Sequence, residues 1–356
     1  MNYIKTIDGL RGLSVLAVIF FHMNIPGFQG GFIGVDIFFV ISGFLITSII
    51  LKEKKLEIFS LKDFYERRAR RLLPSLFIVI FFTILISPFI LLPGELKDFG
   101  ESLIATSFFS SNIFFWREAG YFENPAHFKL LLHTWSLAIE EQFYILFPIF
   151  LLSCWRLGLK NLNIFFILSL CAILSFTLAN LIQPYFSVAN FYLLPTRAWE
   201  LIAGVLIAFY LQSSFHQNFD LRASNTLNNF LSIVGLLLII ISILLFNANT
   251  PHPGLFTSVP IFGAVLLLLF VMPGSFMEKI LGSKIMVHFG LLSYSLYLWH
   301  WPLNIFFERL EDHNPIPINV LVLVTTYFFA LLTWSTAEKY FRNKKNFSSK
   351  QDRKSV

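Results

Sequence analysis

The sequence predicts an all-α polytopic membrane protein, with about ten transmembrane helices and with both termini in the cytoplasm. Of its 356 residues, 56% are hydrophobic and 13% are charged, and the mean hydropathy is +0.69. Soluble domains have about 25% charged residues, so this composition excludes an ordinary soluble globular protein. Long apolar runs recur along the chain, and Lys and Arg gather in alternate connecting segments. These observations together predict the fold class and its orientation.

A spanning helix needs about 20 largely apolar residues, because the hydrocarbon core of a bilayer is about 30 Å thick. The first such run has no small-residue cleavage site, so we expect a retained helix and not a signal peptide. The segment 100–116 is short and rich in Ser and Asn, which favours an interfacial helix over an eleventh span. The expected spans are 8–26, 32–51, 75–93, 136–155, 162–182, 195–212, 230–247, 258–273, 286–307 and 316–337.

Positive charge predicts the orientation of these spans. With a cytoplasmic N-terminus, 22 Lys and Arg residues fall on the inside and four fall outside, as the positive-inside rule requires. The basic residues are spread over several loops, so the net charge of +6 does not indicate nucleic-acid binding. The predicted organisation is a membrane domain at 1–340, followed by a short basic cytoplasmic tail at 341–356. Cys154 and Cys171 lie in apolar stretches and are expected to be buried, and no metal site is expected.

Two ionisable residues lie in the first span, where such side chains are costly and often functional. Arg11 and His22 are eleven residues apart, which places their Cα atoms about 16 Å apart on one face of a helix. A cation at one end and a proton-transfer group at the other would suit a thioester donor that reaches in from one side. For His22 the alternative is a packing role. Asp36 begins the next span and either holds one ring nitrogen of His22 or caps its own helix.

An arginine cluster precedes the third span. It consists of Arg67, Arg68, Arg70 and Arg71, and Pro74 is expected to stop the preceding segment and place the cluster at the mouth of that span. Guanidinium groups bind phosphate in a bidentate manner, so the arginine cluster could clamp a phosphate-bearing ligand. Equally, the arginine cluster could anchor the protein to anionic lipid on the cytoplasmic side.

Further polar residues lie toward the expected outer ends of later spans. Glu140 and Tyr144 are four residues apart and share a helix face, although carboxylates at a helix start can also simply offset its dipole. Arg197 and Glu200 are three residues apart, which suits either a structural ion pair or direct chemistry. His300 lies between two tryptophans, which an aromatic belt at the membrane boundary would explain. The histidine itself is not explained by such a belt.

Together these blocks resemble the acyltransferase-3 family of bacterial membrane O-acyltransferases, in order and over nearly the whole chain. The matching blocks are Asp8-Gly9-Leu10-Arg11-Gly12, the Arg-x10-His spacing of Arg11 and His22, Gly34-Val35-Asp36-x-Phe38-Phe39-Val40-x-Ser42-Gly43, Arg67-x-x-Arg70-Arg71-x-x-Pro74, Trp135-Ser136-Leu137-x-x-Glu140-x-Gln142-Phe143-Tyr144, Arg197-x-x-Glu200, and Tyr297-Leu298-x-His300-x-Pro302.

The resemblance implies that acyl-CoA, most commonly acetyl-CoA, is the donor and enters from the cytoplasm. Known members acetylate the O-antigen of lipopolysaccharide, other surface polysaccharides or peptidoglycan, which implies a multi-pass protein of the bacterial inner membrane and a carbohydrate acceptor. Many members carry an extra helix and an outward SGNH-hydrolase-like domain, whereas this chain ends after its tenth expected span. Direct transfer and handover to a separate periplasmic transferase therefore remain alternatives.

The resulting hypothesis assigns roles to several of the candidate residues. The predicted catalytic residues are His22, Asp36, Glu140, Tyr144, Arg197, Glu200 and His300. The arginine cluster and Arg11 would hold the CoA phosphates. His22, supported by Asp36, would act as general base on a sugar hydroxyl, while Arg197, Tyr144 or an indole N–H would stabilise the oxyanion. A ping-pong route in which His22 itself is acylated is not separated from direct transfer. A transporter or proton relay built on the buried Asp, Glu and His residues is the alternative class.

Overall fold

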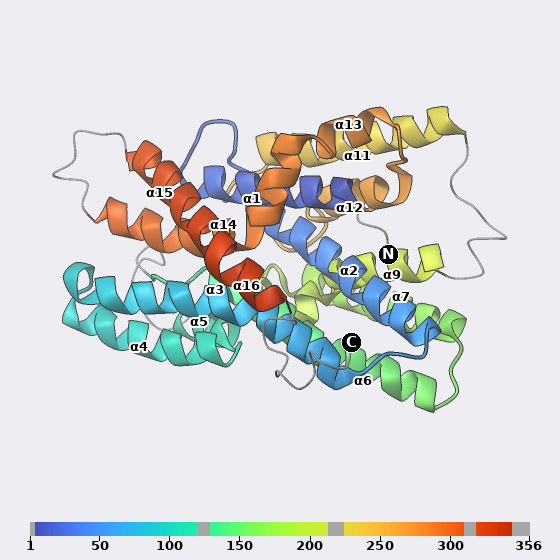
Figure 1. The fold of residues 1–356 in the computed structure, drawn as a ribbon, viewed down its shortest axis with the longest axis horizontal. Helices are drawn as coiled ribbons and strands as arrows, with labels where there is room; N and C mark the ends of the chain where they lie inside the picture. The colour runs from blue at the N-terminus through green and yellow to red at the C-terminus, as the bar shows by residue number, and fades with distance from the viewer. Residues whose placement is uncertain (1–3, 120–128, 213–223, 310–317, 344–356) are drawn as a thin grey trace, which may run out of the picture. The chain divides into compact units, whose positions relative to one another are not determined.

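The computed structural model describes residues 4–119, 129–212, 224–309 and 318–343, and within these ranges all regular structure is helical (Figure 1). The chain contacts define two compact units. The first unit consists of Met1–Ile58, Ile104–Ala126 and Leu132–Ser293, and the second of Phe59–Leu103, His127–Leu131 and Tyr294–Val356.

Most of the described helices belong to the first unit. They are α1 (Lys5–His22), the 3₁₀ turn η1 (Gly31–Ile33), α2 (Gly34–Lys55), α5 (Ser111–Glu118), α6 (Thr134–Arg156), α7 (Asn161–Ile182), α8 (Ser187–Tyr192), α9 (Leu194–Gln212), α11 (Asn225–Leu245), α12 (Ser258–Phe270) and α13 (Phe276–Leu281). The second unit contains α3 (Leu61–Ile90), α15 (Ile318–Thr333), the π-helical turn η4 (Trp334–Glu338) and α16 (Lys339–Arg342). Two helices contribute residues to both units: α4 (Pro93–Ser107) and α14 (Lys284–Glu308).

The helical fold and its apolar spans confirm the predicted class, a polytopic membrane protein. Among the described residues, seven helical segments are long and apolar enough to cross a bilayer: Gly31–Lys55, Leu61–Ile90, Thr134–Arg156, Asn161–Ile182, Ser187–Gln212, Asn225–Leu245 and Ile318–Arg342. The expected spans 8–26, 258–273 and 286–307 correspond to α1, α12 and α14, which are not among these seven. The count of ten and the cytoplasmic placement of the termini stay predictions.

Close backbone contact fixes α2 against α9, the most extensive helix pair of the first unit. A Cβ added at Gly43 would lie 1.9 Å from the carbonyl oxygen of Leu201, and one added at Gly204 would lie 1.9 Å from that of Val40. Small residues allow membrane helices to approach in this way. A buried apolar cluster then joins these two helices to α1, α11 and α12. The N-terminal turns of α2 and α9, which carry the polar site, are therefore held together rigidly.

Helix α1 is also packed backbone to backbone. A Cβ on Gly9 would lie 1.7 Å from the carbonyl oxygen of Leu281, and one on Gly12 would lie 2.4 Å from that of Met286. These glycines flank Arg11 in the sequence, so the Asp8–Gly12 block has a packing function besides its charge. Arg11 and His22 lie on this one continuous helix, as predicted.

The structure corrects the predicted position of the arginine cluster. Helix α3 runs without interruption from Leu61 to Ile90, and Pro74 lies inside it, so Pro74 neither ends a segment nor begins one. Proline removes one backbone hydrogen bond but does not end this helix. The N-terminus of α3 is capped by Ser60, whose hydroxyl accepts a hydrogen bond from the Asp63 N–H. The arginine cluster therefore lies on the helix itself and not on a loop at its mouth.

Three smaller expectations can also be compared with the structure. The segment 100–116 is divided between α4 and α5, each too short to span a bilayer alone. Cys154 is buried as expected, whereas Cys171 is exposed, so the expected burial of Cys171 was wrong. Most of the predicted tail at 341–356 lies outside the described residues.

Candidate active site

Two carboxylates share one guanidinium inside the first unit. Arg197 Nη1 lies 2.7 Å from Asp36 Oδ1 and 3.0 Å from Glu200 Oε1, and its Nε donates to the Phe191 carbonyl at 3.1 Å. All three charged side chains are 0–1% exposed. The rings of Trp135 and Phe191 lie 5.3 and 4.9 Å from the guanidinium carbon. The predicted i, i+3 pair of Arg197 and Glu200 is thus present, within a larger ionic site.

One oxygen of each carboxylate in the ionic site lacks a partner in the part of the chain that the structure describes. Asp36 Oδ2 and Glu200 Oε2 are buried and have no hydrogen-bond partner among the described residues. Buried acceptors without a partner are costly and are uncommon in folded proteins. A ligand hydroxyl or a proton that bound to either oxygen would therefore satisfy an acceptor that has no partner among the described residues.

A histidine that the sequence analysis did not identify completes this site. His252, in the segment between α11 and α12, lies with Nε2 3.4 Å from Asp36 Oδ1 and Nδ1 3.0 Å from Thr257 Oγ1. Its ring packs edge-on against Phe32, with 4.9 Å between centroids. Burial and the nearby Arg197 charge hold the pKa of His252 well below its ordinary value. We call Asp36, Arg197, Glu200 and His252 the buried charge cluster.

Asp36 does not have the partner that the sequence predicted. It binds Arg197 and approaches His252, whereas the predicted pairing with His22 is not among its contacts. A permanently charged guanidinium is the stronger partner for a desolvated carboxylate than an imidazole. The alternative of a helix cap was wrong too, because the N-cap of α2 is Ile33 and Asp36 lies within the first turn.

His22 is the last residue of α1 and is partly exposed. Its ring lies 5.1 Å from that of Phe21, and Phe21 in turn lies 5.5 Å from Phe32, which packs against His252. A continuous series of aromatic contacts therefore connects His22 with the buried charge cluster. The two groups belong to one region of the first unit even though Asp36 does not bind His22.

Glu140 forms a second, partly buried contact with α2. Its Oε1 accepts hydrogen bonds from the hydroxyls of Tyr144 and Ser42. The predicted i, i+4 contact of Glu140 with Tyr144 is confirmed, and Ser42 adds a contact that only the tertiary fold provides. Because α6 begins at Thr134, Glu140 lies in the second turn and does not cap the helix. The Tyr144 hydroxyl donates to Glu140 in this structure, and its role at a substrate oxyanion stays a prediction.

His300 lies on α14, in the part of this helix that belongs to the second unit. It is 1% exposed, and its Nδ1 lies 2.6 Å from the carbonyl oxygen of Tyr297. The neighbouring tryptophans are buried and donate their indole N–H groups to Thr333 Oγ1 and to the Lys129 carbonyl. The expected belt of tryptophans at the lipid boundary was therefore wrong at this place, since these side chains are internal packing groups.

The basic candidates have carboxylate neighbours. Arg11 Nη1 lies 3.2 Å from Asp8 Oδ1, with the Arg11 side chain 14% exposed. In the arginine cluster, Arg70 forms an ion pair with Glu66 at 2.9 Å. On a helix of 3.6 residues per turn, Arg67, Arg70 and Arg71 share one face and Arg68 lies beside it. Three of the four guanidinium groups could therefore address one ligand.

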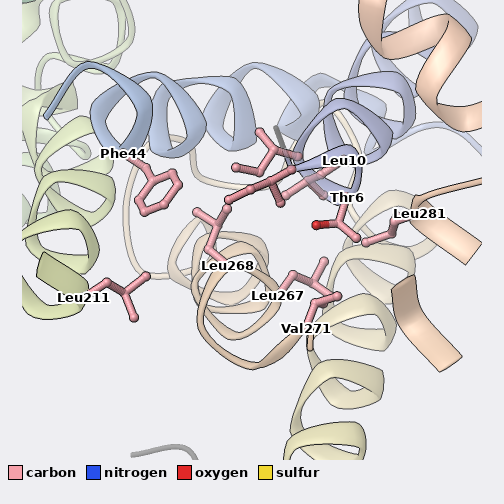
Figure 2. A pocket seen from close by; sticks show the side chains of 10 residues that line it. Thr6, Leu10, Phe44, Leu211, Leu267, Leu268, Val271 and Leu281 are labelled. Atoms are coloured by element: carbon pink, nitrogen blue, oxygen red, sulfur yellow. The ribbon is translucent and has the colours of Figure 1, made fainter. Parts of the chain in front are cut away.

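A small cavity lies beside the first turns of α1 (Figure 2). Its volume is about 110 Å³, and its lining is apolar apart from Thr6, with Leu10, Phe44 and Leu267 among the lining side chains. No charged side chain lines it, so it offers no ligand for a phosphate. Within the described ranges, no three His, Cys, Asp or Glu side chains are placed to hold a metal ion.

The fold and the site define an integral membrane protein with a buried ionic site between its helices. That site contains two carboxylates, a guanidinium and an imidazole. A family described as "Acyltransferase domain" matches residues 4–336. The chain belongs to this family, acyltransferase-3, over these residues.

Relatives that are similar over nearly the whole chain are named as O-acetyltransferases. A Staphylococcus aureus protein named "Putative O-acetyltransferase" is 35% identical over 359 residues, which cover 96% of this chain and 58% of the relative. Peptidoglycan O-acetyltransferase OatA of Listeria monocytogenes is 35% identical over 350 residues, covering 96% and 56%. The chain thus spans less than three fifths of the length of these relatives. No solved structure matches the chain.

Proposed function

We propose that the protein transfers an acetyl group from cytoplasmic acetyl-CoA to a hydroxyl of a cell-envelope carbohydrate, across the bacterial inner membrane. The family match over residues 4–336 carries this proposal. Among relatives, those named for an acceptor are named for peptidoglycan, so a cell-wall glycan is the first acceptor to test. The positions of Arg11 and His22 on α1 support a donor that enters at one end and reacts at the other.

In the proposed reaction, Arg11 binds a phosphate of CoA by charge-assisted hydrogen bonds, and the arginine cluster is a separate candidate for phosphate binding. The pantetheine arm follows α1 over the approximately 16 Å that separate Arg11 from His22, bringing the thioester to His22. Supporting this assignment, Arg11 is paired with Asp8 by one nitrogen only, so its other N–H groups can serve a ligand. The charge distribution of the loops supports the cytoplasmic placement of this end.

His22 is the proposed general base. It takes the proton of the acceptor hydroxyl as the oxygen attacks the thioester carbon, and it returns that proton to the CoA sulfur when the C–S bond breaks. The products are an O-acetyl ester and free CoA. Because Arg197 is held by two carboxylates inside the protein, its proposed role is to order the site, not to bind the oxyanion. In the ping-pong variant, His22 carries the acetyl group between the two steps.

The decisive experiment measures acetyl transfer in membrane vesicles that contain the wild type or His22→Ala at equal protein level. Radiolabelled acetyl-CoA is supplied, and base-labile acetate on the glycan is counted. We expect His22→Ala to lose transfer by about 10²- to 10⁴-fold, the usual contribution of a general base. His288→Ala, at a partly exposed histidine of α14, is the matched control. Undiminished acetylation by His22→Ala would contradict the proposed role.

The orientation is tested in the same system. Inside-out vesicles expose the cytoplasmic face, so they should accept added acetyl-CoA, whereas right-side-out vesicles should not. A transporter or proton relay is the second candidate, favoured by the two unpartnered carboxylate oxygens in the buried charge cluster. It predicts proton flux without acetyl-CoA, which a pH-sensitive dye inside the vesicles would detect.

A further inference from the structure

His252 has a polar partner at each ring nitrogen. Nδ1 lies 3.0 Å from Thr257 Oγ1, and Nε2 lies 3.4 Å from Asp36 Oδ1. Thr257 Oγ1 also accepts a hydrogen bond from the Gly254 N–H at 3.1 Å. Thr257 is fully buried and Asp36 is fully buried. The imidazole therefore connects the segment before α12 with the ionic site on α2 and α9.

The contacts of Thr257 and Asp36 together indicate which ring nitrogen carries the proton. A threonine hydroxyl has one proton to donate and can accept from two donors. The Gly254 N–H uses one of the acceptor positions, and among the described residues Nδ1 of His252 is the acceptor within reach of the hydroxyl proton. Because the Asp36 carboxylate paired with Arg197 can only accept, a favourable contact requires Nε2–H toward Asp36. In the neutral ring Nδ1 is then unprotonated and accepts from the Thr257 hydroxyl.

We propose that His252, oriented by Thr257, is a positioning residue of the acyl-transfer site: its Nε2–H holds Asp36 Oδ1 in the pair with Arg197. This inference rests on the proposed function for the reaction that it serves. It assigns a role to a residue outside every block that carries the family resemblance. Asp36 Oδ2 is buried and has no hydrogen-bond partner among the described residues.

Packing and charge both support a neutral, fixed imidazole. Phe32 packs edge-on against the ring at 4.9 Å, and Phe191 lies 6.0 Å away. Burial lowers the pKa of His252, the charge of Arg197 lowers it further, and Glu200 opposes these effects more weakly. The ring is thus a hydrogen-bond donor of fixed direction and not a second cation beside Arg197.

The first test reads the tautomer directly. Full-length protein with ¹⁵N-labelled histidine is reconstituted in bilayers, and the signals of His252 are those missing from His252→Gln. We expect an unprotonated Nδ1 and a protonated Nε2 in the wild type and in Thr257→Ser, which keeps the hydroxyl. Thr257→Val, of nearly the same shape, should give a mixture of tautomers. A protonated Nδ1 in the wild type would overturn the inference.

The second test separates positioning from general loss of structure. His252→Gln keeps an N–H donor in reach of Asp36, whereas His252→Leu does not. Per folded protein, we expect His252→Leu to lower kcat about tenfold with KM for acetyl-CoA unchanged, since one hydrogen bond to a charged group is lost. His252→Gln should recover most of kcat. Equal losses in both variants, or a change in KM alone, would contradict positioning.

The two tests also separate this inference from the proposed function. If the wild type transfers no acetyl group, the proposed function fails, while the ¹⁵N signals still establish or refute the hydrogen-bond chain through His252. If His252→Leu does not fold, the comparison of Thr257→Val with Thr257→Ser decides the result by the same kinetic and spectroscopic readings.

Discussion

Asp36 and Arg197 are 161 positions apart in the sequence and form an ion pair of 2.7 Å with both side chains 0–1% exposed. The pair joins the first turns of α2 and α9, about two turns before Gly43 and Gly204, at which these helices pack closely. Breaking a buried ion pair leaves one desolvated charge without compensation. The stability of the first unit should therefore depend strongly on this contact.

Removing the guanidinium tests this dependence. We expect Arg197→Ala to lower the free energy of unfolding by about 3–5 kcal/mol, because two buried carboxylates lose their shared cation. Thermal unfolding in detergent measures the effect. The matched control is Arg309→Ala, which breaks the partly exposed pair with Glu95 and should cost at most about 1 kcal/mol. Similar losses in both variants would show that the buried pair is not special.

The glycine contact between α2 and α9 makes a separate prediction. In Gly204→Ala the new Cβ would lie 1.9 Å from the Val40 carbonyl oxygen, so the helices must separate, at a cost of about 1–3 kcal/mol. Gly100→Ala, where a Cβ meets no atom within 4 Å, should be neutral or stabilise α4 by up to about 1 kcal/mol. Denaturation of the two variants under one condition compares them. A stable Gly204→Ala would contradict the close packing.

Arg11 should matter for donor binding and not for turnover. An ammonium group lacks the planar fork that binds phosphate oxygens in pairs, so Arg11→Lys should raise KM for acetyl-CoA by about tenfold, or about 1.4 kcal/mol, with little change in kcat. Arg156→Lys, at an exposed arginine at the end of α6, controls for a general effect of replacing arginine by lysine. Unchanged acetyl-CoA binding by Arg11→Lys would argue against donor contact.

His252 gives the fold a pH dependence with a defined sign. The pKa of His252 in the folded protein is held well below 6.5, so below pH 6.5 the unfolded chain binds a proton that the folded protein does not. Stability from this group is complete above that pH and is lost as the pH falls, by up to about 1.4 kcal/mol per pH unit. The charged groups that face the ring are Asp36, Arg197 and Glu200.

Comparing unfolding midpoints from pH 7.5 to pH 5 in the wild type and His252→Gln isolates this contribution, because all other titrating groups are shared. The wild type should lose stability more steeply on acidification. Parallel curves for the two proteins would show that the folded protein binds the proton as readily as the unfolded chain does.

Local spacing determined which parts of the site could be predicted. Arg197 with Glu200, and Glu140 with Tyr144, are neighbours on one helix turn, so their contacts follow from sequence separation. The partner of Asp36 is set by the packing of two helices, which one sequence does not reveal. His252 was missed because it lies outside every expected span. A histidine is unusual inside the membrane but common in a connecting segment, so its position did not indicate a function. The expected stop at Pro74 was wrong because a proline inside a membrane helix does not always end it.

The glycine contacts of α1 have a consequence for motion. With Gly9 pressed on the Leu281 backbone and Gly290 on that of Asp8, where an added Cβ would lie 1.7 Å from the carbonyl oxygen, α1 has no room to rotate or slide against its neighbours. Main-chain atoms, unlike side chains, cannot change rotamer to make way. Helix α1 is thus fixed against its neighbours. In the proposed reaction, the pantetheine arm of the donor would have to move along α1 while α1 itself keeps its position.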